Sequence, residues 1–409
     1  MSGARVIGQA PLGPEFVVAD TSIDASFQQP AALACDGQSV CAVVWTSVRP
    51  DGGQNNERIW VATYTAEGRL IRRTTIFDGD QGVPTAVGLA SGFTFFLDRV
   101  GRDGITTPVF RVFDENLDPQ ADEVALPLHD SPYQSPAAYY GICGVARSAK
   151  GYVLLSTAFT SPIVQDRLGV FLYFVDSQGR LLRNRVAVNQ YQSDDARLPQ
   201  NGGGIAEDSA GNLIVTYYKA AGNRNGPWDV YLRRFSPSGE PLGPELRVNT
   251  YRKDAQWFPQ LAVSPDGQFL VVWQSKGEDG SDDGIYARLY SKEGWWLTRG
   301  FRVNDLTFSA QRFPHVAADR LGNYFIGWSS FPADEVRGYE VKGKVYRHDL
   351  TPVGGEYFLN QQRLYDQILT QATFTLDGTL FALWSSASPQ QAGGEGAVPV
   401  ARRFAVTPP

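Results

Sequence analysis

The chain has 409 residues, of which 43% are hydrophobic and 12% aromatic, so it carries enough apolar material for a large core and does not have the composition of a disordered polymer. Its formal net charge is −6, which argues against a broad surface for nucleic acid or for anionic lipid. No run approaches the roughly 18 apolar residues that a membrane-spanning helix requires. We therefore expect neither a nucleic-acid partner nor a transmembrane segment.

The first residues, MSGARVIGQAPLGPEF, lack the apolar stretch of a secretory signal peptide. Further along, Cys35 and Cys41 flank DGQSV, whose Asp-Gly pair predicts a hairpin turn. Two cysteines facing each other across such a turn approach within disulfide distance, and the alternative is two buried thiols. A disulfide implies an oxidising compartment, so we expect an extracytoplasmic protein whose signal was removed, with a cytoplasmic location as the alternative.

One pattern recurs along the whole chain. The pattern is clearest in FPQLAVSPDGQFLVVWQS (258–275) and FPHVAADRLGNYFIGWSS (313–330). Each copy begins with a proline and a short apolar strand, turns at a glycine, and continues with an apolar strand that ends in tryptophan and serine. Similar copies occupy 29–47 and 370–386, and weaker copies lie between them. The turn glycines recur every 55 to 60 residues, at Gly37, Gly92, Gly151, Gly211, Gly267, Gly322 and Gly378. Seven units at one spacing indicate a repeat protein.

Each unit continues with two more strands rich in aromatic and β-branched residues, and no stretch of comparable length has a helical period. The second strands, such as FLVVW and YFIGW, are apolar throughout rather than alternating, as expected when both faces of a sheet are covered. Four-stranded units that pack on both faces predict an all-β, seven-bladed β-propeller of antiparallel blades.

The last unit has three strands, and PLGPEFVVAD (11–20) resembles PLGPELRVNT (241–250), a fourth strand. We therefore expect the N-terminal strand to complete the last blade and close the ring, which removes an open sheet edge. The prediction is a single domain, 1–409, with approximate blades 30–82, 83–135, 136–198, 199–258, 259–313, 314–368 and 369–409 plus the closing strand 11–20.

The repeats resemble the roughly 55-residue propeller repeats of secreted and surface proteins of bacteria. The resemblance lies in the run FRVN, DAQWFP, DGQFLVVWQS and DGSDDGIYAR, and it covers essentially the whole chain. It implies a propeller attached to a surface or secreted protein, and no single activity follows from it.

The loops between second and third strands vary in length, whereas the hairpins on the opposite face (AEGRL, SQGRL, PSGEP) are short and uniform. We expect binding on the variable face. The blade linkers on this face place Asn249 and Asp254 where Asx side chains cap turns. The alternative is a set of sugar-binding pockets, in which aromatic rings stack on the sugar. The candidate binding residues are Tyr191, Trp228, Tyr251, Trp257 and, at a hairpin tip, Trp295.

The loop GEDGSDDG (277–284) gathers four carboxylates, which hard cations such as calcium prefer as ligands. These candidate metal ligands are Glu278, Asp279, Asp282 and Asp283. Because the loop lacks EF-hand spacing and no other blade repeats it, we favour a solvated acidic loop, with calcium as the alternative and no other cofactor expected.

Catalytic motifs are absent from the sequence: there is no histidine-based triad, zinc spacing or P-loop. His315 occupies the position of Gln260 and Gln200 in sibling blades, and Cys143 is expected to be a buried free thiol. We therefore favour a non-enzymatic propeller that binds a protein partner or a cell-surface assembly. A glycan-binding lectin is the alternative, and a polysaccharide hydrolase or lyase with carboxylates at the central channel is the second alternative.

Trp295 and Trp296 lie side by side in KEGWWLTRG, at the predicted turn between the third and fourth strands of the fifth unit. Alignment on the glycine places Trp296 at the position of Leu70, which predicts packing against its own blade. Trp295 takes the position of Arg69, which predicts exposure. An exposed tryptophan is either incidental or an anchor for a partner.

Overall fold

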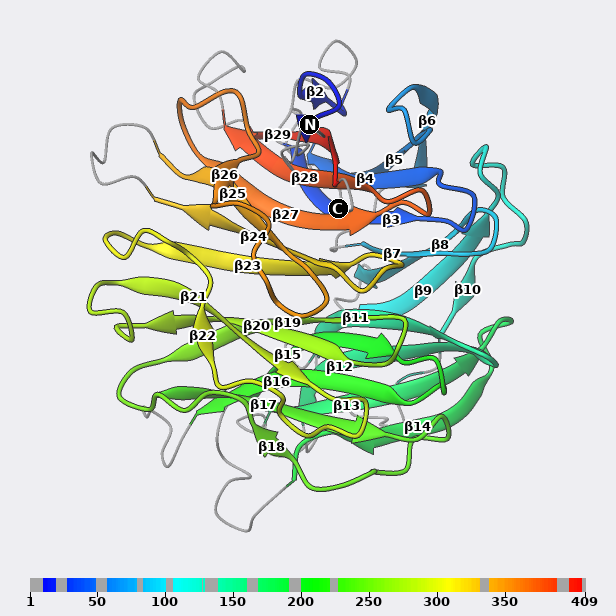
Figure 1. Ribbon diagram of the computed structural model, residues 1–409. Coiled ribbons are helices and arrows are strands. Elements are labelled where there is room, and N and C mark those ends of the chain that lie inside the picture. Colours follow the sequence, from blue (N-terminus) through cyan, green and yellow to red (C-terminus); the bar gives the residue numbers. More distant parts are fainter. Residues whose placement is uncertain are drawn as a thin grey trace, which may run out of the picture.

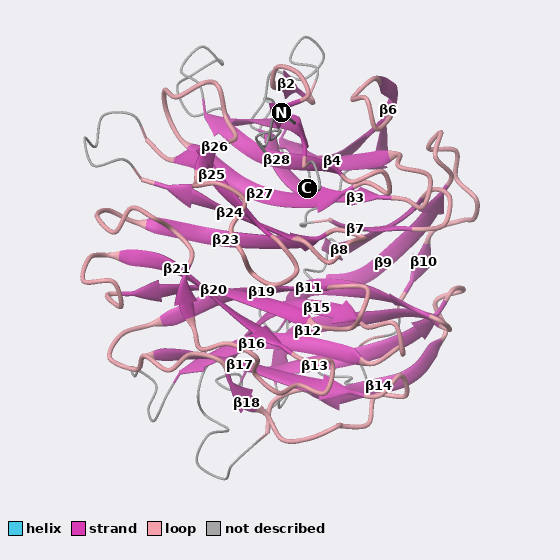
Figure 2. Cartoon of the chain, in the orientation of Figure 1, coloured by secondary structure: helices cyan, strands magenta, loops and turns pink. Residues whose placement is uncertain are grey.

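The computed structural model describes residues 10–19, 28–48, 57–78, 84–100, 106–126, 128, 139–159, 168–190, 200–220, 227–331, 338–387 and 397–406. Within these ranges every regular element is a β-strand (Figure 2). The described residues include no helix long and apolar enough to cross a membrane.

The strands form seven antiparallel sheets, the blades of a propeller, and the all-β fold prediction is confirmed. Blade 1 contains β3 (Gln28–Cys35), β4 (Cys41–Val48), β5 (Glu57–Tyr64) and β6 (Leu70–Asp78). Blade 2 contains β7 (Thr85–Gly88), β8 (Phe93–Val100), β9 (Thr106–Phe113) and β10 (Val124–Ala125). Blade 3 contains β11 (Tyr139–Ser148), β12 (Gly151–Phe159), β13 (Leu168–Asp176) and β14 (Leu181–Ala187).

The next three blades repeat this order. Blade 4 contains β15 (Gln200–Glu207), β16 (Leu213–Ala220), β17 (Trp228–Phe235) and β18 (Leu246–Arg247). Blade 5 contains β19 (Gln256–Val263), β20 (Phe269–Lys276), β21 (Asp283–Tyr290) and β22 (Phe301–Arg302). Blade 6 contains β23 (Gln311–Ala318), β24 (Tyr324–Ser330), β25 (Glu340–Tyr346) and β26 (Tyr357–Phe358). Figure 1 shows the first strand of each blade near the centre of the ring and β6, β10, β14 and β18 toward its rim.

Blade 7 joins segments from both ends of the chain. Its strands β27 (Gln367–Phe374), β28 (Thr379–Ala387) and β29 (Ala397–Ala405) are completed by β1 (Ala10–Pro11) and β2 (Phe16–Val17). Both short strands pair antiparallel with β29, Ala10 opposite Ala405 and Phe16 opposite Ala401. The N-terminal segment therefore closes the ring, as the sequence predicts.

The core lies between neighbouring blades, because the second strand of each blade is buried on both faces. The tryptophans near the ends of these strands, Trp45, Trp273, Trp328 and Trp384, are among the largest fully buried side chains. A buried indole N–H usually finds a partner, and in blades 6 and 7 a glutamine at the start of the first strand supplies it, whereas the Trp273 N–H of blade 5 has none among the described residues. Trp328 donates to Gln311 at 2.9 Å and Trp384 to Gln367 at 3.1 Å.

The hairpins between first and second strands use one turn repeatedly. In blade 4 the Oδ1 atom of Asp208, and in blade 6 that of Asp319, accepts the backbone N–H groups of the residues two and four positions later. The residue three positions after the aspartate has a left-handed backbone, which favours glycine. In blade 1 this residue is Ser39, with φ 66°, and in blade 6 it is Gly322, with φ 84°. Ser39, and not the predicted marker Gly37, therefore corresponds to Gly322.

At the rim, three pairs of neighbouring blades are joined by a reciprocal link. A glutamate just before the fourth strand accepts an N–H from the preceding blade, and its own N–H donates to a side chain of that blade. The pairs are Gln190 with Glu245, Asp305 with Glu356, and Gln361 with Glu15. Two of these glutamates also form ion pairs with lysines that are almost buried, Lys219 to Glu245 at 2.5 Å and Lys342 to Glu356 at 2.8 Å.

Candidate binding surfaces

The face that carries the second-to-third connections, which we call the loop-rich face, is the predicted binding face. Most of these connections lie wholly or partly outside the described residues, whereas that of blade 5, between β20 and β21, is described. The predicted binding residue Tyr191 also lies outside them. The site therefore has to be built from the strand ends that reach this face in blades 4 to 6.

Five aromatic rings form a continuous series at these strand ends, which we call the aromatic strip: Trp228, Tyr218, Phe258, Trp257 and Phe313. Ring centroids lie 5.2 Å apart for Trp228 and Tyr218, and 5.9 Å apart for Tyr218 and Phe258. Phe258 continues the series to Trp257 at 6.1 Å and to Phe313 at 5.6 Å. These spacings are typical of interacting rings. Two of the predicted residues, Trp228 and Trp257, thus belong to one surface.

The two phenylalanines owe their exposure to an irregularity at the start of the first strands. Phe258 and Phe313 have φ values of 50° and 55°, where residues with side chains are uncommon. Strand pairing shifts at the same point, between Trp257 and Gln260 and between Arg312 and His315. The rings remain 40% and 36% exposed, although Phe-Pro within an apolar strand would be expected to pack inside.

Arg312 and Asn201, beside the aromatic strip, already have partners, whereas the buried Trp257 Nε1 has none among the described residues. Arg312 donates to Asp283 at 2.7 Å and to the Tyr339 hydroxyl at 2.9 Å. Burial alone would lower the pKa of Arg312, but the hydrogen bond and charge of Asp283 outweigh it and raise that pKa. Asn201 donates to the Tyr218 hydroxyl at 3.2 Å. The strip therefore presents mainly ring faces rather than free polar groups.

Tyr251, another predicted binding residue, takes no part in the ring contacts described for the aromatic strip. Its hydroxyl donates to Asp254 at 3.1 Å and contacts the Gly277 carbonyl at 3.3 Å. Nearby, Asn249 accepts the Val230 N–H at 2.9 Å and donates to the Tyr251 carbonyl at 2.7 Å. Asn249 thus bonds backbone groups, as the structural interpretation of the linkers predicts, whereas the contact described for the Asp254 carboxylate is with a side chain.

The acidic loop of blade 5 uses its carboxylates within the protein. Glu278 accepts from the Ser275 hydroxyl at 2.6 Å, and Asp282 and Asp283 both contact the Arg312 guanidinium. Asp279 accepts the Ser281 N–H at 3.1 Å. Among the described residues, no three His, Cys, Asp or Glu side chains are grouped to hold a metal ion. The calcium alternative therefore gains no geometric support.

A cavity of about 430 Å³ lies on the axis of the ring, bounded by the first strands of several blades. Its described wall contains threonine, glutamine, glycine and small apolar residues, together with His315 and Cys143, and no carboxylate. Cys143 was expected to be buried, but it is exposed to this cavity. Burial within the ring nevertheless raises the pKa of its thiol, so the thiolate that nucleophilic catalysis requires is disfavoured.

His315 and Gln371 each join their own blade to the next one. His315 Nδ1 accepts the Ala372 N–H at 3.3 Å, and Gln371 Oε1 accepts the Leu33 N–H at 2.9 Å. The register aligns His315 with Gln260, as predicted, but aligns Gln200 with Gln256 instead. The error arose because the glycines that follow Gln200 obscure the sequence alignment. Burial lowers the pKa of His315 to about 4, so the ring is neutral near pH 7.

Trp295 and Trp296 lie on the opposite face, which we call the hairpin face. Trp295 is 73% exposed, as predicted, but Trp296 is 62% exposed and does not pack against its blade. The backbone alignment holds, because Trp296 pairs with Tyr290 as Pro241 pairs with Phe235. The prediction of packing was wrong because the position itself is open: Leu70, used for the comparison, is 43% exposed.

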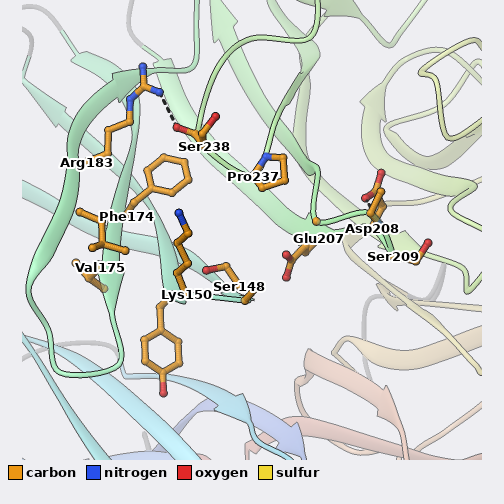
Figure 3. Close-up of a pocket in the computed structure, with 15 residues that line it drawn as sticks. Ser148, Lys150, Phe174, Val175, Arg183, Glu207, Asp208, Ser209, Pro237 and Ser238 are labelled. Carbon is orange, nitrogen blue, oxygen red and sulfur yellow. Dashed lines mark hydrogen bonds between the residues drawn. The ribbon is translucent and has the colours of Figure 1, made fainter.

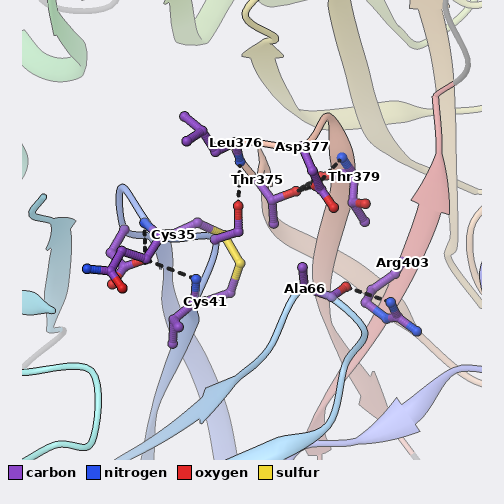
Figure 4. The surroundings of a disulfide bond; sticks show 12 residues. Cys35, Cys41, Ala66, Thr375, Leu376, Asp377, Thr379 and Arg403 are labelled. Atoms are coloured by element: carbon purple, nitrogen blue, oxygen red, sulfur yellow. Dashed lines mark hydrogen bonds between the residues drawn. A yellow bond between two sulfur atoms is a disulfide. The ribbon is translucent and has the colours of Figure 1, made fainter. Parts of the chain in front are cut away.

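Cys35 and Cys41 are joined by a disulfide across the first hairpin of blade 1, with Cα atoms 4.0 Å apart (Figure 4). The same hairpin reaches blade 7, where the Leu376 N–H donates to the Ser39 hydroxyl at 3.0 Å. The disulfide therefore stabilises a hairpin beside the point of ring closure.

Comparison with known proteins identifies a fold class only. No protein-family model matches the sequence, and no curated protein matches it. A Dyadobacter fermentans protein of unknown function aligns over 100% of both chains, with 10% identity and a TM-score of 0.52. An ulvan lyase of polysaccharide lyase family PL25 aligns over 92% of this chain and 94% of its own, with 13% identity and a TM-score of 0.56.

A third similar structure is the acylaminoacyl peptidase of Pyrococcus horikoshii, which aligns over 94% of this chain but 54% of its own, with 12% identity and a TM-score of 0.51. At such identities the likeness extends to the propeller fold and not to activity. The lyase and the peptidase have different activities, and the third protein is of unknown function, so the function has to be argued from this chain's own surfaces.

Proposed function

We propose that this propeller is a non-catalytic binding module that holds a protein partner, such as a subunit of a surface assembly, on the aromatic strip of its loop-rich face. The observation that carries the proposal is the exposure of Phe258, which joins the series of rings, and of Phe313 at one end of it. Interfaces favour aromatic anchors.

A protein partner fits the strip better than a sugar does. A sugar site combines a ring face with polar groups free to orient hydroxyls. Beside this strip, Arg312 and Asn201 are engaged within the protein, so the free surface is apolar. A glycan is the second candidate, because exposed aromatic rings also stack on sugars.

A polysaccharide hydrolase or lyase gains no support from the channel. Such catalysis needs carboxylates or comparable acid and base groups at the site. The described wall of the axial cavity contains no carboxylate, the lowered pKa of His315 makes its ring a weak base, and the raised pKa of Cys143 keeps its thiol protonated. For the location we propose an extracytoplasmic compartment, supported by the Cys35–Cys41 disulfide.

Site-specific crosslinking of the full chain tests the proposal. A photoreactive phenylalanine analogue at position 313 is expected to capture a partner that the same analogue at position 376, on the hairpin face, does not capture. The double variant Phe258→Ser/Phe313→Ser is then expected to weaken binding of the purified partner by at least about tenfold, since buried aromatic anchors contribute 2 kcal/mol or more. The matched control is Leu376→Ser, which removes an apolar side chain that is more exposed than either phenylalanine.

A glycan array probed with wild type and with the double variant separates the two candidates. If wild type binds a sugar and the double variant does not, the ligand of the aromatic strip is a glycan rather than a protein. A partner whose affinity is unchanged in the double variant would overturn the role of the strip in either form.

A further inference from the structure

A second cavity, of about 810 Å³, opens on the hairpin face between blades 3 and 4 (Figure 3). It exists because the first hairpin of blade 3 is short. There Ser148 pairs directly with Gly151, which leaves a two-residue turn, whereas in blade 4 Glu207 pairs with Leu213 across five residues. The missing residues leave the space beside the blade 4 hairpin unfilled.

An acidic side chain occupies this cavity at a position that is not acidic in other blades. The strand register places Glu207 at the position of Val263, Ala318 and Phe374. Burial, assisted by the Asp208 charge, raises the pKa of Glu207, and Arg147 offsets part of this effect. Within the residues that the structure describes, the Glu207 carboxylate forms no hydrogen bond or salt bridge. A carboxylate kept in a partly apolar place without such a partner is free to bind a ligand.

A cation lies on the other wall. Lys150, in the two-residue turn, lines the same cavity and forms no salt bridge with the described residues. Lys150 and Glu207 are also not paired with each other, and Figure 3 shows them approaching the hollow from different hairpins. Of the neighbouring charges, Asp208 accepts two N–H groups of its own turn and Arg183 donates to Ser238 and Glu240, whereas Arg147 acts on Glu207 through its charge.

The rest of the wall is mainly apolar, formed by Phe174, Tyr152, Leu182 and Pro237. A volume in this range, apolar walls and a few polar groups are typical of small-molecule sites. We propose that the cavity binds a small zwitterion with an apolar body, a free amino acid or a short peptide, whose ammonium pairs with Glu207 and whose carboxylate pairs with Lys150. This site is separate from the aromatic strip, and neither proposal depends on the other.

Calorimetric titration of the full chain with L-phenylalanine tests the site. We expect binding, and we expect phenethylamine, which lacks the carboxylate, and 3-phenylpropanoate, which lacks the ammonium, to bind at least about tenfold more weakly, because each loses one charge-assisted contact. The dipeptide Phe-Ala distinguishes a free amino acid from a peptide as the better ligand. Failure of every probe to bind at millimolar concentration would overturn the proposal.

Two variants assign the charges. Glu207→Val introduces the residue of the sibling blade 5, so it is compatible with the fold, and it should weaken L-phenylalanine at least about tenfold while leaving 3-phenylpropanoate unchanged. Lys150→Gln should weaken L-phenylalanine while leaving phenethylamine unchanged. The matched control Lys292→Gln/Glu293→Gln alters an exposed pair on the same face and should have no effect. Undiminished binding of L-phenylalanine to Glu207→Val, with an unchanged circular dichroism spectrum, would contradict the assignment.

Discussion

The seam between blades 3 and 4 and the seam between blades 4 and 5 differ at one position of the repeat. In the first, Glu245 exchanges hydrogen bonds with Gln190 of the neighbouring blade and forms an ion pair with Lys219. In the second, Gly300 stands at the position of Glu245, as the register of the fourth strands shows. Blade 5, which lacks the glutamate, also exposes Trp295 and Trp296. Blade 3 likewise has Arg185 in place of the glutamate, so a blade can join the ring without the rim link.

The largest effect is expected from breaking the linked seam. Glu245→Ala leaves Lys219, whose side chain is 6% exposed, without its partner and removes the link to Gln190. Removal of one member of a buried ion pair costs about 3–5 kcal/mol. Equilibrium urea unfolding should show a loss of this size. Glu240→Ala, which removes an exposed partner of Arg183, should cost less than about 1 kcal/mol. Equal losses of unfolding free energy in Glu245→Ala and Glu240→Ala would mean that Glu245 contributes no more than an exposed ion pair does.

A link near the axis is expected to depend on pH. His315 joins blades 6 and 7 as a neutral acceptor, with its pKa lowered to about 4. The pKa of a histidine in the unfolded chain is about 6.5, so the contribution of neutral His315 to the free energy of unfolding is complete above pH 6.5. This contribution is lost as the pH falls toward 4, by up to about 3 kcal/mol. His315→Gln, the residue of blades 5 and 7, should flatten the fall in unfolding free energy between pH 6.5 and 4. Parallel pH curves for both proteins would refute this role.

Placing a carboxylate at the same position of blade 5 should have a smaller effect. A Cβ at Gly300 would lie 3.6 Å from the Arg288 guanidinium and no closer than 3.4 Å to Trp273, which is ordinary contact. Gly300→Glu is therefore expected to stabilise the protein by about 1 kcal/mol, through a charge-assisted hydrogen bond near Arg288. Thermal unfolding measures the gain. Gly300→Gln is the control for the charge, and a lower midpoint for Gly300→Glu than for wild type would argue against equivalence of the two seams.

The smallest effect on stability is expected at the tip of blade 5. Trp295→Arg introduces the residue found at the corresponding positions 69 and 180, and surface changes of this kind alter stability by less than about 0.5 kcal/mol. If the exposed pair is a partner contact, the variant should reduce self-association or partner capture in sedimentation and pull-down experiments. Unchanged association and solubility would mean that Trp295 is an incidental exposed residue.

Most of the fold could be predicted from the sequence because each blade repeats one arrangement of turns and apolar strands. The second strand of blade 5, FLVVW, shows its burial directly in its composition, and the likeness of 11–20 to 241–250 predicts ring closure. The site was less predictable, because exposure depends on backbone detail. The left-handed backbone of Phe258 and Phe313 turns rings outward from a strand that has an ordinary apolar sequence.

Other errors have the same origin. The alignment that placed Trp296 beside Leu70 is right for the backbone, yet it says nothing of whether that position is covered. Cys143 was taken as a buried free thiol because it has no evident partner in the sequence, but its first strand has one side toward the axial cavity. The cavity beside Lys150 was missed because it results from the length of one hairpin rather than from a motif. The signal was present in SAKG, the shortest of the first hairpins.

Closure of blade 7 by strands from both ends of the chain has a consequence for synthesis on the ribosome. The segment containing β1 and β2 emerges first, but its partner β29 emerges only after six blades have been made. The early segment must therefore wait with its backbone groups unpaired while later blades assemble. The ring becomes complete only when the last strand is available, so a chain stopped before residue 397 would keep an unpaired sheet edge and be prone to aggregation.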